Sequence, residues 1–159
     1  MTITLEAIGT IYTPFKEEKG MPIQAVAAKD VEGYIEINEE FVPGLKDIEE
    51  FSHLTLIYHL HLVTDVSLEV KPFLDHQPHG VFATRYPRRP NKIGLSTVRL
   101  QRAEGNRLYI SEVDMLNETP LLDIKPFVPQ FDNRETNQIG WFQGKVGKVD
   151  RTRAYEENE

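Results

Sequence analysis

The sequence predicts a mainly β protein, a compact single-domain β-barrel with a few short helices, on three observations. Segments with strand-like alternation outnumber those with helical spacing. Ten glycines and ten prolines, spread over 159 residues, divide the chain into many short elements. No two glycines stand two residues apart, so the Gly-x-Gly turn of a Rossmann fold is missing. Many short strands without long helices between them favour a barrel or sandwich over a doubly wound sheet.

The strongest strand candidate is the segment 55–63, which carries apolar side chains on both alternating faces and therefore suits a central strand. Residues 97–102 alternate more cleanly between apolar and polar side chains. After the turn signal at 104–106 a second run covers 107–114, and the two runs together predict a hairpin. Further strand candidates are 3–12, 34–37, 80–84 and 139–149.

One short amphipathic helix is predicted where Leu45, Ile48 and Phe51 recur every three residues with charged side chains between them. No internal repeat and no linker divides the chain. We therefore expect one domain over residues 1–149, followed by a polar, flexible tail over 150–159.

The composition is that of an ordinary globular protein and excludes several kinds of site. Hydrophobic residues make up 40% and charged residues 27% of the chain, a balance that disordered and collagen-like proteins lack. The absence of cysteine excludes disulfides, thiol nucleophiles and iron–sulfur clusters. The first twenty residues have no signal-peptide core, and the longest apolar stretch, 54–63, is too short to cross a bilayer. We expect a cytoplasmic protein without a membrane segment.

The net charge of −7 is distributed unevenly along the chain. Seven of the 18 basic residues and only one of the 25 acidic residues lie between Arg85 and Arg107, which leaves 11 basic and 24 acidic residues elsewhere. An acidic body with one cationic stretch is typical of a protein that holds a polyanion at one place and repels it elsewhere. A solvated basic loop is the alternative interpretation.

The histidines allow two interpretations. His59 and His61 would share one face of the strand 55–63, as metal ligands in small barrels do, and His76 and His79 lie in a loop nearby. A metal site of that kind also needs a carboxylate a few residues after the pair. The simpler interpretation is polar residues that line a pocket, so no metal is assigned. A histidine-based, metal-dependent small-molecule enzyme stays an alternative.

Two passages have the composition of a ligand site. In 79–96, two prolines stiffen a loop rich in arginine, whose guanidinium groups match anionic ligands, and Gly94 allows either a positive φ or a close approach to the backbone. In 114–129, Asp123 and Lys125 stand two residues apart and share one face of an extended chain. We interpret this pair as part of a ligand site; the alternative interpretation is a plain salt bridge at the barrel rim.

The residues of these passages match a known family in order and spacing. They are Gly80-Val81-Phe82-Ala83-Thr84-Arg85, Arg89-Pro90-Asn91, Ile93-Gly94-Leu95-Ser96, and Thr119-Pro120 with Leu122-Asp123-Ile124-Lys125-Pro126. Supporting stretches are 8–9, 13–15 and 51–54. From Thr4 to Val149 the chain thus resembles the TsaA-like family, also called TrmO, of S-adenosylmethionine-dependent tRNA methyltransferases.

The resemblance implies a β-barrel methyltransferase that acts as a homodimer and uses S-adenosylmethionine. It further implies N6-methylation of the threonylcarbamoyl-adenosine 3′ of the anticodon (t6A37 to m6t6A37) in threonine tRNA. The family's cofactor contacts fall on Pro22, Ile23, Gln24, His61, Arg85, Leu95, Leu116, Asn117, Glu118 and Thr119. Three positions depart from the family's pattern: Asn117-Glu118 replaces Asp-Gly, Ile23 replaces a basic residue and Phe127 replaces a tyrosine.

Catalytic and RNA-binding roles follow from the chemistry of the implied reaction. A weakly nucleophilic N6 must lose its proton at or before transfer, and Asp123 is predicted to help accept it, with Lys125 orienting Asp123 or pairing with the threonyl carboxylate. Contacts to tRNA are predicted for Arg88, Arg89, Asn91, Lys92, Arg99 and Arg102. A non-catalytic RNA-binding barrel stays a second alternative, and it predicts RNA affinity without S-adenosylmethionine binding.

Overall fold

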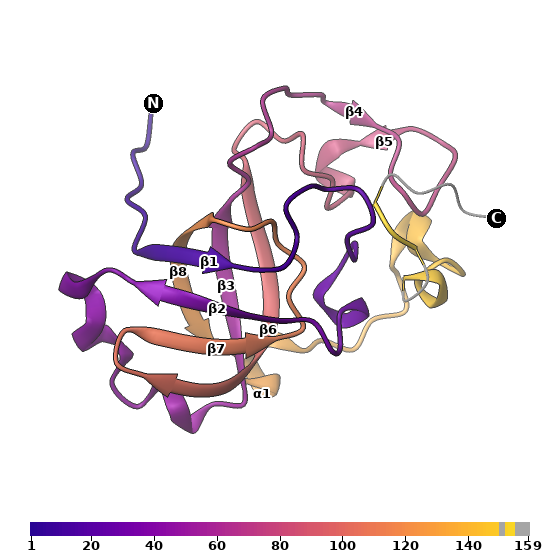
Figure 1. The fold of residues 1–159 in the computed structure, drawn as a ribbon. Helices are drawn as coiled ribbons and strands as arrows, with labels where there is room; N and C mark the ends of the chain where they lie inside the picture. Colours follow the sequence, from indigo (N-terminus) through magenta and orange to yellow (C-terminus); the bar gives the residue numbers. More distant parts are fainter. Residues whose placement is uncertain (150–151, 155–159) are drawn as a thin grey trace.

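The computed structural model describes residues 1–149 and 152–154, and its centre is a closed antiparallel barrel (Figure 1). The strands follow one another around the barrel in the order β1-β2-β7-β6-β3-β8. Their bounds are β1 Gly9–Tyr12, β2 Glu32–Ile37, β3 His53–His59, β6 Ile93–Glu104, β7 Arg107–Ser111 and β8 Thr119–Pro126. A small ribbon of β4 Glu69–Val70 and β5 His79–Gly80 lies beside the barrel. The predicted mainly β barrel is confirmed.

Strand alternation fills the interior of the barrel. Leu54, Leu56 and Tyr58 of β3 are buried and pack with Val98 of β6 and Leu121 of β8 in one apolar core. Strand β3 pairs with β6 on one side and β8 on the other, so its apolar residues on both faces do mark a central strand. Closure pairs every barrel strand with two neighbours, which leaves no sheet edge at this core.

The helical segments are short. They are the 3-10 turns η1 Ala25–Ala27, η2 Glu39–Leu45, η3 Ile48–Glu50, η4 Val81–Ala83, η5 Gly140–Phe142 and η6 Val146–Lys148, and the α-helical turn α1 Pro129–Asp132. The amphipathic helix predicted around Leu45, Ile48 and Phe51 is instead two 3-10 turns, interrupted at Asp47 with a φ of 65°. Apolar residues three apart fit the three residues per turn of a 3-10 helix as well as they fit an α-helix.

The hairpin prediction is confirmed, but several strand predictions fail in whole or in part. Of the strand predicted for 3–12 only 9–12 form β1, and of the strand predicted for 80–84 only Gly80 lies in a strand, because 81–83 form η4. Strands β6 and β7 are joined at Gly105, which has a φ of 59°. The strand predicted for 55–63 ends at His59, because His61 turns back to donate its backbone N–H to the His59 carbonyl. The strand predicted for 139–149 is wrong, since this segment forms η5 and η6 around glycines, two of them with positive φ.

One end of the barrel carries the long connections. Tyr12, His59 and Ser111 end their strands there, and Glu32, Ile93 and Thr119 begin theirs. The connections 13–31, 60–92 and 112–118 therefore meet at this end, together with the segment 134–149 that returns to it after α1 (Figure 1). Of the predicted flexible tail, residues 150–151 and 155–159 lie outside the described residues. No helix among the residues described here has the length and apolar character to cross a membrane.

Candidate functional site

A cavity of about 1160 Å³ opens at the end of the barrel where the connections meet. Sites for small molecules usually have volumes of about 300–1,000 Å³, so this one has room for a nucleoside ligand beside a second group. Most of its lining comes from residues 18–26, 60–97, 112–119 and 139–154. Stretches of chain far apart in sequence thus enclose one space.

Most of the predicted cofactor contacts line this cavity. They are Pro22, Ile23, Gln24, His61, Arg85, Leu95, Leu116 and Thr119. Two of them also contact each other across the cavity, because Arg85 Nη1 donates to Gln24 Oε1 at 3.0 Å. The structure therefore brings the arginine loop and the 22–24 loop together. Contact of these residues with a cofactor stays a prediction.

Asn117 and Glu118, the other two predicted contacts, build the turn before β8 and do not line the cavity. Glu118 has a φ of 62°, the left-handed conformation for which glycine is best suited. The Asn117 side chain accepts the backbone N–H of Thr13 at 3.1 Å, and the Thr119 hydroxyl donates to the Leu116 carbonyl at 2.7 Å. The turn thus keeps a positive φ without the family's glycine.

Gly94 allows a close approach to the backbone and has no positive φ. It stands opposite Tyr58 in the β3–β6 register, and a Cβ at Gly94 would lie only 2.1 Å from the tyrosine ring. The ring therefore occupies the space of the missing side chain. This placement brings the Tyr58 hydroxyl to 2.9 Å from Ser96 Oγ.

The hydroxyls of Tyr58 and Ser96 lead to Asp114, which the sequence reasoning did not select. Ser96 Oγ donates to Asp114 Oδ1 at 2.6 Å, so the Tyr58 hydroxyl donates to Ser96 in turn. All three residues line the cavity. Burial raises the pKa of Asp114 to about 6, even though the Ser96 hydrogen bond and the Arg85 charge both lower it. A carboxyl group with this pKa can accept or release a proton near neutral pH.

Asp123 and Lys125 lie elsewhere. Their side chains form a salt bridge of 2.9 Å, retain 47% and 63% of their exposure and do not line the cavity. Asp123 Oδ1 also accepts the backbone N–H of Ile124 at 2.9 Å. The structure thus shows a salt bridge on the outside of the barrel, as the alternative interpretation requires, and the catalytic role of the pair stays a prediction.

The basic stretch is divided into separate parts, so it does not form one continuous patch. Arg89 lines the cavity, but its Nη1 donates to the carbonyls of Val81, Thr84 and Tyr86 and so shapes the loop. Arg102 stacks on Tyr109 at 3.7 Å, seven residues along β6 from Leu95, which is about 23 Å in a strand.

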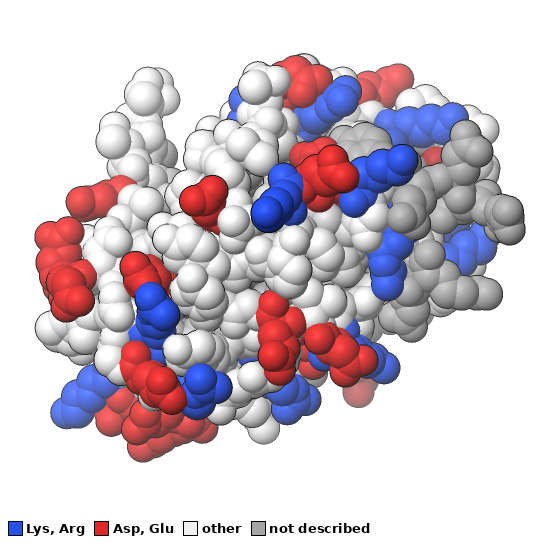
Figure 2. Space-filling view, viewed as in Figure 1, with Lys and Arg blue, Asp and Glu red and all other residues white. Residues whose placement is uncertain are grey.

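Acidic partners accompany three of the predicted RNA contacts, namely Asp65 with Arg88, Glu112 with Arg99 and Glu104 with Arg102. Lys92 Nζ donates to the Thr64 carbonyl at 3.0 Å, and Asn91 is exposed. Figure 2 shows the same interspersion of charges over one face of the molecule. The positive charge that this stretch presents is therefore smaller than its sequence suggests.

The histidines do not gather. His59 is exposed, whereas His61 lines the cavity, and burial together with the nearby His59 lowers the pKa of His61. His79 pairs with Asp75 at 2.8 Å. Within residues 1–149 and 152–154, no three histidine or carboxylate side chains are grouped as metal ligands.

Comparisons with known proteins agree with the fold. Residues 10–133 match the model of the tRNA-methyltransferase O N-terminal domain. A Pyrococcus abyssi protein named probable S-adenosyl-L-methionine-binding protein is 55% identical over 153 residues, which are 96% of this chain and 83% of the relative. The human tRNA (adenine(37)-N6)-methyltransferase is 33% identical over 135 residues, 80% of this chain and 31% of the relative.

A crystal structure of TrmO from Pseudomonas aeruginosa matches with a TM-score of 0.74 at 38% identity, over 89% of this chain and 62% of that chain. This chain therefore spans less than two thirds of that protein and about a third of the human relative. The family model covers far more than half of the chain, and the barrel is common to both folds. On this evidence the chain belongs to the TsaA-like, or TrmO, family.

Proposed function

We propose that this chain binds S-adenosylmethionine in the cavity and is a tRNA methyltransferase. Its substrate in this proposal is the threonylcarbamoyl-adenosine at position 37 of threonine tRNA, which it converts to the N6-methyl form. The observation that carries the proposal is the cavity that Arg85, Leu95 and Thr119 line together. The names of the relatives support the cofactor and the nucleoside position.

The residues of the cavity fit the chemical groups of this cofactor. Apolar side chains at Leu95, Leu116 and Met115 suit an adenine ring. The exposed guanidinium of Arg85 suits the methionine carboxylate, which it can bind through two parallel hydrogen bonds. When bound, the cofactor supplies an electrophilic methyl group on a positively charged sulfur.

Asp114 is the residue that we propose as the acceptor of the N6 proton. The bound cofactor would supply the methyl group to N6, and the Asp114 carboxylate would accept the proton that N6 loses. Ser96 orients this carboxylate through the 2.6 Å hydrogen bond, and Tyr58 in turn orients Ser96. Asp123, the acceptor predicted from the sequence, stays the competing assignment, and the substitutions described below decide between the two.

Contacts to tRNA are proposed for Arg88, Asn91 and Lys92, which lie in the connection before β6 at the cavity end of the barrel. Phosphate contacts of this kind supply affinity that falls as salt rises, while the cavity recognises the unstacked nucleoside. The proposal also includes a cytoplasmic homodimer, in which two basic rims face one tRNA. Light scattering on the purified chain tests the dimer through a mass twice that of one chain.

The experiment that tests the proposed function uses two anticodon stem-loops of threonine tRNA, one with threonylcarbamoyl-adenosine at position 37 and one with plain adenosine. We expect the chain with S-adenosylmethionine to convert only the first, as detected by nucleoside mass spectrometry. Equal methylation of both would overturn the substrate assignment. RNA binding without cofactor binding would instead support the alternative function of a non-catalytic RNA-binding barrel. Loss of activity with a chelator would support the alternative function of a metal-dependent enzyme.

A further inference from the structure

The segment 139–149, which we call the strap, forms a wall of the cavity although it lies beyond the family domain. The family model ends at residue 133. The strap nevertheless adds Ile139, Trp141, Phe142, Val146 and Val149 to the lining. In Figure 1 it is the yellow segment beside β5. The barrel domain alone therefore leaves this side of the cavity open.

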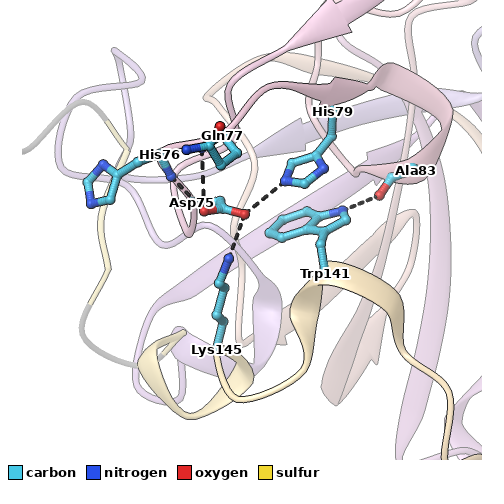
Figure 3. Close-up of polar contacts among 7 residues, drawn as sticks. All are labelled: Asp75, His76, Gln77, His79, Ala83, Trp141 and Lys145. Carbon is cyan, nitrogen blue, oxygen red and sulfur yellow. Dashed lines mark hydrogen bonds and ion pairs between the residues drawn. The ribbon is translucent and has the colours of Figure 1, made fainter.

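Asp75 holds the strap by a salt bridge (Figure 3). Its Oδ2 accepts from Lys145 Nζ of the strap at 2.5 Å and from His79 Nε2 at 2.8 Å, while Oδ1 accepts the backbone N–H of His76 at 2.7 Å. The side chain retains only 11% of its exposure. Lys145 and, next, His79 hold the pKa of the Asp75 carboxyl well below its usual range. The Asp75 carboxylate is thus charged, and it binds both Lys145 of the strap and His79 of β5.

Trp141 links the strap to the loop that carries Arg85. Its Nε1 donates to the Ala83 carbonyl at 2.7 Å, and its ring stacks on His79 with centroids 4.6 Å apart. Figure 3 shows the indole beside the His79 ring, with its nitrogen directed at the Ala83 carbonyl. Since Ala83 precedes Arg85 by two residues, the docked strap fixes the start of the arginine loop.

The chain beyond the strap is joined to the opposite wall. Ala154 donates its backbone N–H to the Met21 carbonyl at 3.0 Å and accepts from Gly20 at 2.9 Å. Arg153 forms a β-bridge with Pro22, one of the predicted cofactor contacts. The strap and residues 153–154 therefore contact both loops whose residues meet in the Arg85–Gln24 hydrogen bond.

We infer that Asp75 is a positioning residue for the ligand site: it docks the strap through Lys145 and His79, and the docked strap sets affinity for an adenosyl ligand. The inference rests on the proposed function for the identity of that ligand. Asp75 itself does not line the cavity, so its effect passes through Trp141 and the arginine loop. Loss of the salt bridge frees the wall without removing any core residue of the barrel.

The test uses the full chain, with S-adenosylhomocysteine titrated calorimetrically and Trp141, the chain's single tryptophan, read by fluorescence. We expect Asp75→Asn and Lys145→Met to weaken binding by about tenfold or more and to shift the Trp141 emission to the red. Lys145→Arg keeps the charge and should restore both readouts. The rate at saturating cofactor should change little, which separates positioning from chemistry.

The matched control is Glu36→Gln, which breaks an exposed salt bridge of 2.9 Å with Arg107 near the hairpin end of the barrel. It should leave both readouts unchanged. Binding by Asp75→Asn and Lys145→Met within about twofold of the wild type, with unshifted emission, would overturn the inference and leave the proposed function standing. A wild-type chain that does not bind the probe would overturn the cofactor assignment and the ligand part of the inference together, while the emission shift still reports whether Asp75 docks the strap.

Discussion

The barrel and the connections at its open end are held together in different ways. In the barrel, backbone ladders join every strand to two neighbours and buried apolar side chains fill the interior. At the open end, single contacts such as Arg85–Gln24 and Asp75–Lys145 join segments far apart in the sequence. Because such contacts can be lost without exposing core, substitutions at the open end should change binding and chemistry more than the free energy of unfolding.

Tyr58, Ser96 and Asp114 connect the two regions. Tyr58 and Ser96 belong to the barrel strands β3 and β6, whereas Asp114 lies in the connection after β7. The barrel strands thereby orient the carboxylate that we propose as the proton acceptor. Substitutions at or beside these three hydrogen-bonded residues test whether the barrel and the connections respond as differently as the structure implies.

The largest effect is expected for Asp114→Asn. The amide keeps the shape of the side chain and a partner for Ser96 but cannot accept the N6 proton, so the methylation rate should fall by about 100-fold or more. Binding of S-adenosylhomocysteine should change little. Single-turnover formation of the methylated nucleoside measures the first quantity and calorimetry the second.

Asp123→Asn is the matched variant, because it neutralises the carboxylate predicted from the sequence. It should keep nearly the wild-type rate, since Asp123 lies outside the cavity lining. A loss as large as that of Asp114→Asn would move the proton acceptor to the Asp123–Lys125 pair and show that our assignment is wrong.

A pH profile should give the next largest effect. With a pKa of about 6 for Asp114, the rate at saturating substrates should fall by about tenfold per pH unit below that value, because the carboxylate becomes protonated. The Asp114→Asn variant should lose this limb. A wild-type rate that stays level down to pH 5 would show that no group with this pKa takes part.

Stability should respond to the same group in the opposite direction. The folded pKa of Asp114 is raised from 3.8 to about 6, so the folded state binds the proton more tightly than the unfolded state. Stability should therefore fall by about 3 kcal/mol as pH rises through that window and stay level above it. Asp114→Asn should remove this dependence, as measured by urea unfolding at pH 4, 5, 6 and 7.

Gly94→Ala should disrupt the packing of Tyr58, the first residue in the hydrogen bonds that lead to Asp114. The added Cβ would lie 2.1 Å from the Tyr58 ring, so we expect a loss of about 1–3 kcal/mol in unfolding free energy and weaker cofactor binding. Gly44→Ala is the control, because no atom lies within 4 Å of its added Cβ. Equal effects of the two substitutions would contradict the close packing of Tyr58 on Gly94.

The smallest effect is expected from a pair of turn substitutions, one in each region. Glu118→Gly should raise the unfolding free energy by less than about 1 kcal/mol, because glycine adopts the φ of 62° in the turn before β8 without the strain of a side chain. Gly105→Ala, at a φ of 59° in the barrel hairpin, should destabilise it by about 1 kcal/mol. Thermal unfolding of both variants checks the signs, and a shared sign would be inconsistent with the backbone conformations.

The barrel could be predicted from the sequence because its signals are local. Alternation along β3 and β6 and the Gly105 turn determine strands and a hairpin that the structure confirms. The segment 139–149, by contrast, was predicted as a strand and contains none. In the structure its apolar residues face the cavity from turns at Gly140 and Gly144, whose positive φ cannot be read from a hydrophobic pattern.

The site could be predicted only where the family resemblance reached. Arg85, Leu95 and Thr119 do share a cavity. Asp123 and Lys125 do share a face, as their spacing implied. Whether that face points toward the cavity or to solvent depends on how the sheet closes, and in the structure the pair is exposed. Asp114 was missed because its enclosure needs Ser96 and the Ala25 backbone, which are remote in sequence.

The central claim is that one cavity at the open end of the barrel holds the methyl donor. A crystal structure of this chain grown with S-adenosylhomocysteine tests it most directly. The account predicts the adenosyl group between Leu95 and Leu116, with the amino-acid carboxylate on Arg85. Ligand bound outside that cavity, or within it but away from Arg85, Leu95 and Thr119, would contradict the account.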